Sequence, residues 1–313
     1  MRPAGYRSSL FSALLGAVLW GLSGTAAQGL FQGFHFPVLG LVAVRMLSGG
    51  GILLLVHRPS RPHPPLMPLV IFSILGFAGS QLTYLFAIQF SNAATATLLQ
   101  FLFLPMVAGY EALTGALKWS VGWSLTLLLA AIGTILLIGG VSGSSFQILI
   151  TPAGLLFGLL AAVCGAYYTL ASRPLVRVHG PWFLTTWGFV IGGLVMLPFG
   201  AFSFLNYAPP SSLAGNADVL FLVAFVIIFG TILGYGLYLS GLRRLSATEI
   251  GIAASIEPIS ATIAAYAFLG VALTTLQYLG GALILVAVIL VASQVGKSQK
   301  AVGQPYSSDV AAK

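Results

Sequence analysis

The sequence predicts an all-α integral membrane protein in which ten transmembrane helices form two inverted five-helix repeats. Three observations lead to this prediction: an apolar composition, ten long apolar runs and a faint internal duplication. Of the 313 residues, 58% are hydrophobic and 6% are charged, and the mean hydropathy is +1.02. A soluble chain is about 25% charged. This chain therefore lacks the polar residues that a water-facing surface needs.

The apolar runs are long enough for helices that cross a bilayer. A hydrocarbon core about 30 Å thick requires about 20 apolar residues in a helix, whereas barrel strands would be about ten residues long with alternating polarity. The ten expected spans are Ser8 to Phe31, Pro37 to Val56, Leu66 to Phe90, Ala93 to Leu113, Trp119 to Gly140, Pro152 to Ser172, Trp182 to Phe204, Ala217 to Leu242, Ser246 to Leu269 and Leu273 to Val295.

The positive charges predict the orientation of these spans. When the amino terminus is placed in the cytoplasm, all of the thirteen Lys and Arg residues except Arg45 fall in cytoplasmic segments. Such segments are enriched in Lys and Arg. We therefore expect a multi-pass protein of the bacterial inner membrane with both termini in the cytoplasm. Because the charges are scattered rather than clustered, the net charge of +8 does not indicate a nucleic-acid partner.

The duplication is visible in two stretches that share an Ala-Thr pair and a proline. Ala94 to Pro105 and Ala247 to Pro258 match when each residue number differs by 153. Each copy would hold five spans, and an odd number makes the second copy enter the membrane from the opposite side. Inverted repeats are typical of transporters that alternate access to a central site. We expect repeats at residues 1–145 and 146–296 and a disordered tail at 297–313.

Several motifs also carry a family resemblance. They are the stretch Tyr238 to Glu249, the triplet Ile256-Glu257-Pro258 and the pairs Leu269-Gly270 and Gly280-Gly281 in the second half, with Trp20-Gly21, Arg45 and Pro105 in the first. Together they resemble the EamA type of the drug/metabolite transporter superfamily, and within it the YddG-type exporters of aromatic and other neutral amino acids. Val271 departs from the pattern, because many relatives have Glu after Leu-Gly.

The resemblance implies a carrier that exports small organic solutes, with aromatic and other neutral amino acids as the expected substrates. Alternatives are a transporter of another metabolite or drug, or a membrane scaffold without transport activity. The sequence has no His-Glu-x-x-His pattern and no phosphate loop. We therefore expect no enzymatic activity, no metal and no cofactor, and partners limited to the substrate and the lipid bilayer around a monomer.

Two charged residues, Arg45 and Glu257, lie well away from the ends of their apolar runs, where a charge costs about 2.5 to 3.5 kcal/mol on insertion scales. Glu257 precedes Pro258 and could be a proton or ligand site, or a structural cap at a helix that the proline breaks. Arg45 could bind a substrate carboxylate, or it could pair with carbonyls or a Glu to hold helices together. The sequence leaves both pairs of alternatives open.

Polar and aromatic residues at intermediate depth complete the candidate substrate site. Each could instead anchor its helix at a membrane interface, but several at mid-depth favour a cavity with aromatic faces and amide donors. The predicted set is Trp20, Ser23, Gln81, Tyr84, Gln100, Tyr168, Trp187, Tyr235 and Tyr238, together with Arg45 and Glu257. Pro105 and Pro258 are the predicted hinges, since proline weakens a helix locally.

Overall fold

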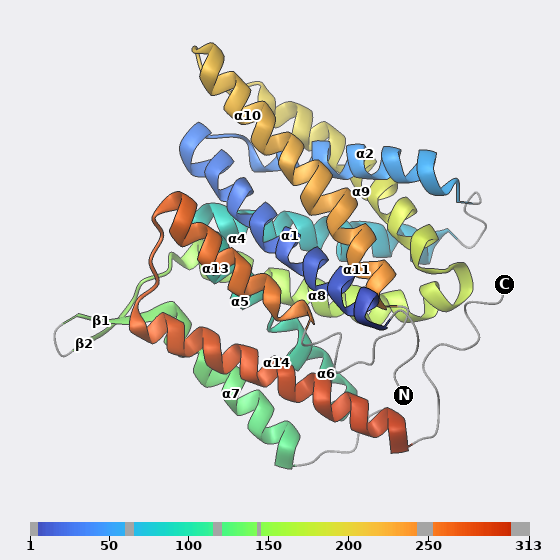
Figure 1. Cartoon of the computed structure of the whole chain (residues 1–313), viewed down its shortest axis with the longest axis vertical. Coiled ribbons are helices and arrows are strands. Elements are labelled where there is room, and N and C mark those ends of the chain that lie inside the picture. Colours follow the sequence, from blue (N-terminus) through green and yellow to red (C-terminus); the bar gives the residue numbers. More distant parts are fainter. Residues whose placement is uncertain (1–5, 60–65, 115–120, 143–144, 243–252, 302–313) are drawn as a thin grey trace.

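The chain folds into a bundle of long helices, seen in the computed structural model of Figure 1. The structure describes residues 6–59, 66–114, 121–142, 145–242 and 253–301. The elements are α1 (Tyr6–Phe34), α2 (Val38–His57), α3 (Met67–Ile71), η1 (Phe72–Ala78), α4 (Gly79–Phe90), α5 (Ala93–Gln100), α6 (Phe103–Leu113), α7 (Val121–Ile138), β1 (Gly139–Ser142), β2 (Ser145–Ile148), α8 (Pro152–His179), α9 (Pro181–Phe204), α10 (Leu213–Phe225), η2 (Val226–Leu233), α11 (Gly234–Leu242), α13 (Ile256–Leu269) and α14 (Thr275–Ala301).

Eight helices within the described ranges are long and apolar enough to cross a membrane, and they correspond to the first eight predicted spans. Two shorter apolar helices, Ile256–Leu269 and Thr275–Val291, fall within the ninth and tenth. The first part of the ninth predicted span, residues 246–252, lies outside the described residues. The protein is therefore a multi-pass membrane protein, while the count of ten spans in two repeats stays a prediction.

Three features differ from the expected helices. A short antiparallel hairpin, β1 and β2, follows α7 where no strand was predicted, and it pairs Gly139 with Ile148. Helix α8 continues to His179 instead of ending at Ser172, and it includes Pro174. A proline is tolerated within a membrane helix where neighbouring groups satisfy the backbone carbonyl that it leaves without a partner. Helix α14 runs to Ala301, so the first residues of the expected tail at 297–313 are helical.

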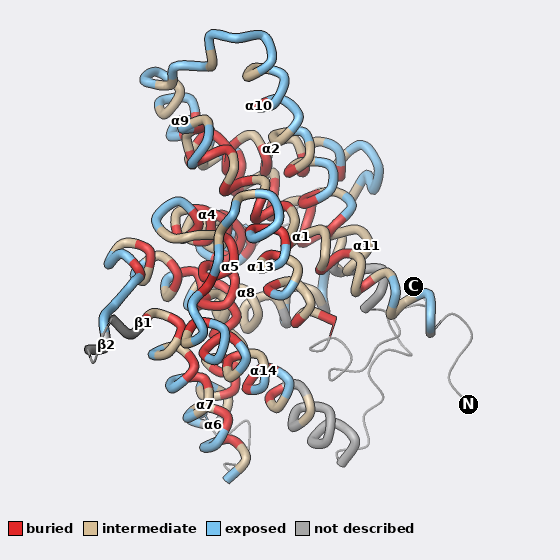
Figure 2. Tube along the Cα trace, turned by 60° about the vertical axis from the view of Figure 1, so that its left-hand side comes forward, coloured by how far each residue is buried: buried red, intermediate tan, exposed pale blue. Residues whose placement is uncertain are grey.

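Close helix pairs form both sides of the bundle. Helix α2 packs along α9, and α7 packs along α14, as Figure 1 shows for the green and red helices at its lower edge. Helix α1 lies against α11 and α13, while α8 lies against α4, α5 and α6. In Figure 2 the buried backbone follows the places where these helices meet, and exposed residues lie on the periphery.

The helix that contains Pro105 is interrupted four residues before the proline. Helix α5 ends at Gln100 and α6 begins at Phe103. Proline has no N–H, and its ring clashes with the carbonyl four residues earlier, which here belongs to Phe101. The local bonds change accordingly, since Leu102 N–H donates to Leu99 and Leu104 N–H donates to Phe101. The single fourth span expected from the sequence is therefore two helices joined by a turn.

A second interruption precedes Pro258. Ser255 forms a turn, and α13 begins at Ile256, so that the proline occupies the first turn of the helix. The first N–H groups of a helix have no partner within it, and proline is tolerated there. Helices α5 and α13 pack against each other. The break before Pro105 therefore follows a helix, α5, that packs against the helix containing Pro258.

Two wider helical turns were not predicted. The segments η1 and η2 are π-helical, and their first residues, Phe72 and Val226, are 154 positions apart. Each lies within an otherwise α-helical span. A π-segment leaves a carbonyl without its usual partner and often marks a functional site. In η2 the side chain of Thr231 donates to the Val226 carbonyl over 3.1 Å, which satisfies one such group.

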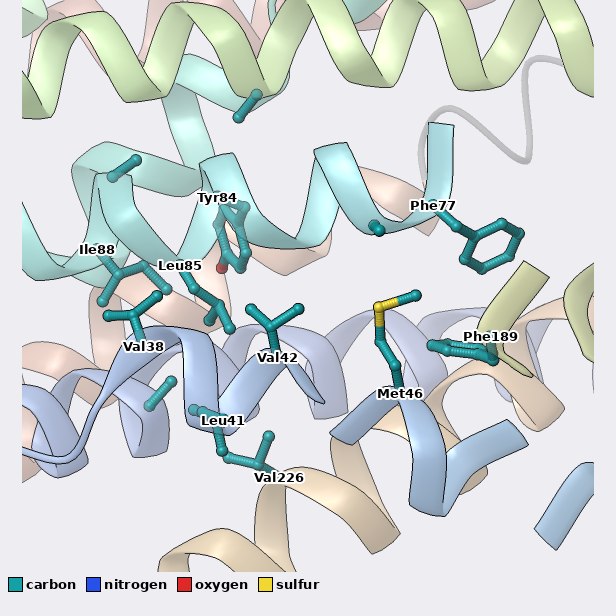
Figure 3. Close-up of a cluster of buried hydrophobic side chains, with 14 of the residues drawn as sticks. Val38, Leu41, Val42, Met46, Phe77, Tyr84, Leu85, Ile88, Phe189 and Val226 are labelled. Atoms are coloured by element: carbon teal, nitrogen blue, oxygen red, sulfur yellow. The ribbon is translucent and has the colours of Figure 1, made fainter. Parts of the chain in front are cut away.

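The largest hydrophobic core cluster lies between α2 and α4. Tyr84, Leu85 and Ile88 of α4 point toward Val38 and Val42 of α2 (Figure 3). Leu85 and Ile88 are completely buried. The cluster also includes Leu30 of α1 and Phe189 of α9, so it joins helices of both halves of the sequence.

The contact between α7 and α14 depends on glycine. A Cβ at Gly280 would lie 2.6 Å from the main-chain oxygen of Gly133, closer than packed atoms allow. Gly280→Ala should therefore separate the two helices and lower the free energy of unfolding by about 1 to 3 kcal/mol. Unfolding in mixed detergent micelles measures the change. Gly51→Ala in α2 is the control, because nothing lies within 4 Å of its added Cβ. Equal stability of the two variants would contradict the packing argument.

Candidate functional site

The middle of α1 is the element around which the polar residues gather. A Cβ at Gly21 would lie 2.5 Å from the main-chain oxygen of Glu257, and one at Gly24 would lie 2.6 Å from the Tyr84 hydroxyl. Between them, Ser23 is buried and presses on the backbone of Gly230. The small residues of α1 thus allow α13, α4 and η2 to approach the same two turns of one helix.

Arg45 reaches this region from α2. It is buried, and its Nε–H donates to the hydroxyl of Thr231 over 2.8 Å. Because Thr231 follows Gly230, the bond places Arg45 beside the segment that contacts Ser23. No described residue accepts a hydrogen bond from the two terminal amino groups of Arg45. A buried guanidinium has five N–H donors, so one bond leaves most of its capacity available.

Glu257 lies at the start of α13 and is half-buried. Its electrostatic partners are the Arg45 guanidinium and the rings of Tyr84, Tyr235 and Tyr238. Within the described part of the chain, no direct ion pair joins Glu257 to Arg45, and no side chain donates a hydrogen bond to the carboxylate. The two charges therefore influence each other across space without contact.

Two hydrogen bonds hold the polar groups beside these charges. The Gln81 amide donates to the Tyr235 hydroxyl over 3.0 Å, which links α4 to α11. Tyr84 and Thr97 are 2.9 Å apart, and since the Thr97 hydroxyl donates to the Ala93 carbonyl, Tyr84 is the donor of the pair. The hydroxyl proton of Tyr235 makes no bond within the described residues. Tyr235 can therefore donate to a bound molecule.

Tyr235 also belongs to a group of packed aromatic rings. We call Trp20, Phe77, Tyr168, Phe189, Tyr235 and Tyr238 the ring cluster. Tyr235 is at its centre, with ring centroids 4.9 Å from Trp20 and 5.3 Å from Phe189. Phe77 lies 5.0 Å from Phe189 and 5.1 Å from Tyr168. Edge-to-face contacts of this kind stabilise rings beyond the area that they bury.

Trp20 has an unused donor. Its indole nitrogen is buried and has no hydrogen-bond partner. The ring is 4.6 Å from Tyr238, and a Cβ at Gly234 would lie 2.8 Å from the indole nitrogen. A buried unsatisfied N–H costs about 1 to 3 kcal/mol. The Trp20 side chain therefore lies where a polar atom of a ligand would be stabilising.

The structure brings most of the predicted site residues together. Arg45, Glu257, Trp20, Ser23, Gln81, Tyr84, Tyr168, Tyr235 and Tyr238 are connected by the contacts described above. Gln100 is half-buried at the end of α5 and has no recorded contact with this group. Trp187 packs near Phe183, with centroids 6.4 Å apart, rather than in the ring cluster.

Sequence reasoning missed four contributors: Thr97, Thr231, Phe77 and Phe189. Thr97 could have been found, because it precedes Gln100 by three residues and shares its helix face. Phe189 also had a signal, since it occupies the position that matches Arg45 at an offset of 144. Thr231 and Phe77 had none, because they are a threonine and a phenylalanine inside π-segments that local patterning does not reveal.

Among the described residues, no group of three His, Cys, Asp or Glu side chains could hold a metal ion. The site offers instead a cation, an anion, hydroxyl and amide groups, and aromatic faces. Such a set suits the binding of a small organic molecule.

The Arg45 bond to Thr231 should be measurable. Thr231→Val keeps the shape of the side chain but leaves the buried Nε–H without its acceptor, which should lower the free energy of unfolding by about 1.5 to 3 kcal/mol. Thr134→Val is the control, because Thr134 donates only to Ala130 of its own helix. It should cost at most about half as much. A Thr231→Val protein as stable as this control would refute the structural importance of the bond.

The chain matches the model of the EamA-like transporter family over residues 7–142 and 152–293. It is 31% identical to the uncharacterised inner membrane transporter YicL of Salmonella typhimurium over 91% of this chain and 95% of that protein. It is 26% identical to the uncharacterised transporter YwfM of Bacillus subtilis over 94% and 96%.

A crystal structure shares the fold, with a TM-score of 0.60 and 19% identity over 96% of this chain and all of the other. The family match covers most of the chain, and the full-length relatives carry transporter names. From its sequence and its helical membrane fold, the protein belongs to the EamA-like transporter family.

Proposed function

We propose that the protein exports neutral amino acids with apolar or aromatic side chains across the bacterial inner membrane. The observation that carries this proposal is that the Arg45 guanidinium and the Glu257 carboxyl group, which are not bonded to each other, lie with a cluster of aromatic rings beside α1. A neutral amino acid carries one positive charge, one negative charge and an uncharged side chain. Each of these parts has a complementary group in the site.

The proposed mechanism is alternating access between two inverted halves, residues 1–145 and 146–296. The two halves make matching contacts, which supports this division. Helix α1 of the first half lies against α11 and α13 of the second, and α8 of the second half lies against the corresponding helices of the first, α4 and α6. Helices α2 and α9 pack together, as do α7 and α14, and each is a pair of counterparts. The family match over two adjacent ranges supports the same division.

Corresponding contacts support this pairing at the level of residues. Gly21 of α1 meets Glu257, and Gly165 of α8 meets Phe103, which adjoins Leu104, the residue 153 positions before Glu257. An offset of 154 relates Gln81 to Tyr235, and these two residues bond to each other. Inverted halves of this kind can rock about a site between them. We place the termini in the cytoplasm on the basis of the positive charges.

Transport is tested with purified protein in liposomes. Vesicles loaded with unlabelled L-phenylalanine should take up labelled L-phenylalanine by exchange, because the site recognises the bound molecule from either side. Unlabelled L-leucine and L-tryptophan should compete, whereas L-lysine and L-glutamate should not, since each adds a charge that has no partner.

Protein-free vesicles provide the background. Repeating the assay with a pH gradient decides whether transport is coupled to protons. Absence of exchange for every neutral amino acid would exclude the proposed substrate class and favour another metabolite or a drug.

The prolines are the proposed hinges. Pro105→Ala restores an N–H that can bond to the Phe101 carbonyl, so that α5 and α6 can join into a straight helix. We expect turnover to fall about tenfold, which corresponds to a barrier about 1.4 kcal/mol higher, with little loss of expression. Pro258→Ala should act in the same direction. Pro209→Ala in the exposed segment before α10 is the control. Unchanged exchange rates in both helix variants would exclude the hinge role.

A further inference from the structure

We propose that Arg45 binds the carboxylate and Glu257 the ammonium group of one zwitterionic substrate, whose side chain extends toward Phe77, Tyr168 and Phe189 of the ring cluster. The inference rests on the proposed function and assigns each part of the substrate to named residues. The two charged residues then act as one recognition unit. In this assignment Arg45 and Glu257 do not form a structural ion pair with each other.

The first step is that the two charges come from different parts of the fold and remain available. Arg45 is on α2, and Glu257 is on α13. Arg45 uses its Nε–H for Thr231, which fixes the guanidinium while leaving its terminal amino groups for a ligand. A carboxylate can accept two parallel bonds from a guanidinium. Glu257 interacts with Arg45 at a distance and has no bonded partner among the described residues.

The second step is that two separated opposite charges favour a molecule that carries both. Ionised groups inside membrane helices are costly unless they are paired. An anion alone would neutralise Arg45 and leave Glu257, while a cation alone would do the opposite. A zwitterion satisfies both groups at once. The same arrangement disfavours a solute with a net charge.

The third step is that the other half of the protein has no charge at the corresponding places. At an offset of 144 the counterpart of Arg45 is Phe189, and at 153 the counterpart of Glu257 is Leu104. Thr231, which accepts the hydrogen bond from Arg45, corresponds to Phe77 at an offset of 154. The ring of Phe77 contacts that of Phe189, with centroids 5.0 Å apart. The hydrogen bond between Arg45 and Thr231 therefore corresponds to an aromatic contact between their counterparts.

The fourth step gives the orientation of the substrate. Tyr235 lies between the charged residues and the aromatic rings. It interacts electrostatically with Arg45 and Glu257, and its ring packs edge-on against Phe189 with centroids 5.3 Å apart. A charged head group beside Arg45 and Glu257 thus places an apolar side chain beside Phe189 and Phe77. The Gln81 amide holds the Tyr235 hydroxyl, so this junction is fixed before a ligand arrives.

The test compares three compounds that differ only in their charged groups. L-phenylalanine has both charges, 3-phenylpropionate has only the carboxylate, and 2-phenylethylamine has only the ammonium group. Binding of each to the purified protein in detergent is measured by titration calorimetry for the wild type, Arg45→Gln and Glu257→Gln. Arg58→Gln and Glu111→Gln are controls that remove the same kinds of charge elsewhere in the chain.

Glu257→Gln should weaken the binding of L-phenylalanine by about 10- to 150-fold, the effect of losing one charged hydrogen bond, but should not weaken that of 3-phenylpropionate. Arg45→Gln should weaken L-phenylalanine similarly and spare 2-phenylethylamine. Both control variants should bind all three compounds as the wild type does. This crossed pattern cannot arise from a general loss of folding, because each variant keeps one ligand.

Three other results would overturn the assignment. Equal weakening of L-phenylalanine and of the spared analogue in each variant would make Arg45 and Glu257 structural residues. Unchanged L-phenylalanine binding in either variant would remove that residue from the site. If the wild type exchanges L-phenylalanine in liposomes and either result appears, only this assignment fails. If the wild type neither binds nor exchanges any neutral amino acid, the proposed function fails as well.

Discussion

A lipid bilayer supplies no hydrogen-bond partner, so the backbone polar groups of a membrane-spanning segment must find their partners within the protein. The structure meets this requirement mainly through unbroken helices. Where the helices are irregular or begin, side chains supply hydrogen bonds to the backbone. The Thr231 hydroxyl donates to the Val226 carbonyl in η2, and the Gln28 side-chain oxygen accepts from the Ala93 N–H at the start of α5 over 2.8 Å. The interruptions lie inside the bundle, where protein groups can replace the missing bonds. Irregular backbone is therefore found where it can be satisfied.

The same requirement explains why the charged residues mark the site. Arg45 donates to the Thr231 hydroxyl, and within the described part of the chain no ion pair joins it to Glu257. A structural ion pair would bring the two together to offset the cost of burial. The observed separation keeps the charges available while Tyr84, Tyr235 and Tyr238 surround them.

The close helix contacts at glycine and the breaks before the two prolines lie near the same polar residues. Gly21 and Gly24 let α13 and α4 come near the middle of α1, so polar groups from distant parts of the sequence share one neighbourhood. The breaks before Pro105 and Pro258 lie on α5/α6 and α13, which border that neighbourhood. The same contacts that gather the polar groups therefore also bring the two breaks close to them.

The sequence by itself determined the membrane class, the approximate extents of eight long helices and the candidates Arg45, Glu257 and Tyr235. Apolar run length and the cost of buried charge are local properties that a sequence reveals. Only the tertiary structure decided that Arg45 bonds to Thr231, that Gln81 bonds to Tyr235 and that Trp187 packs against Phe183. These outcomes depend on π-segments and on helix contacts between residues more than 150 positions apart, which no local pattern encodes.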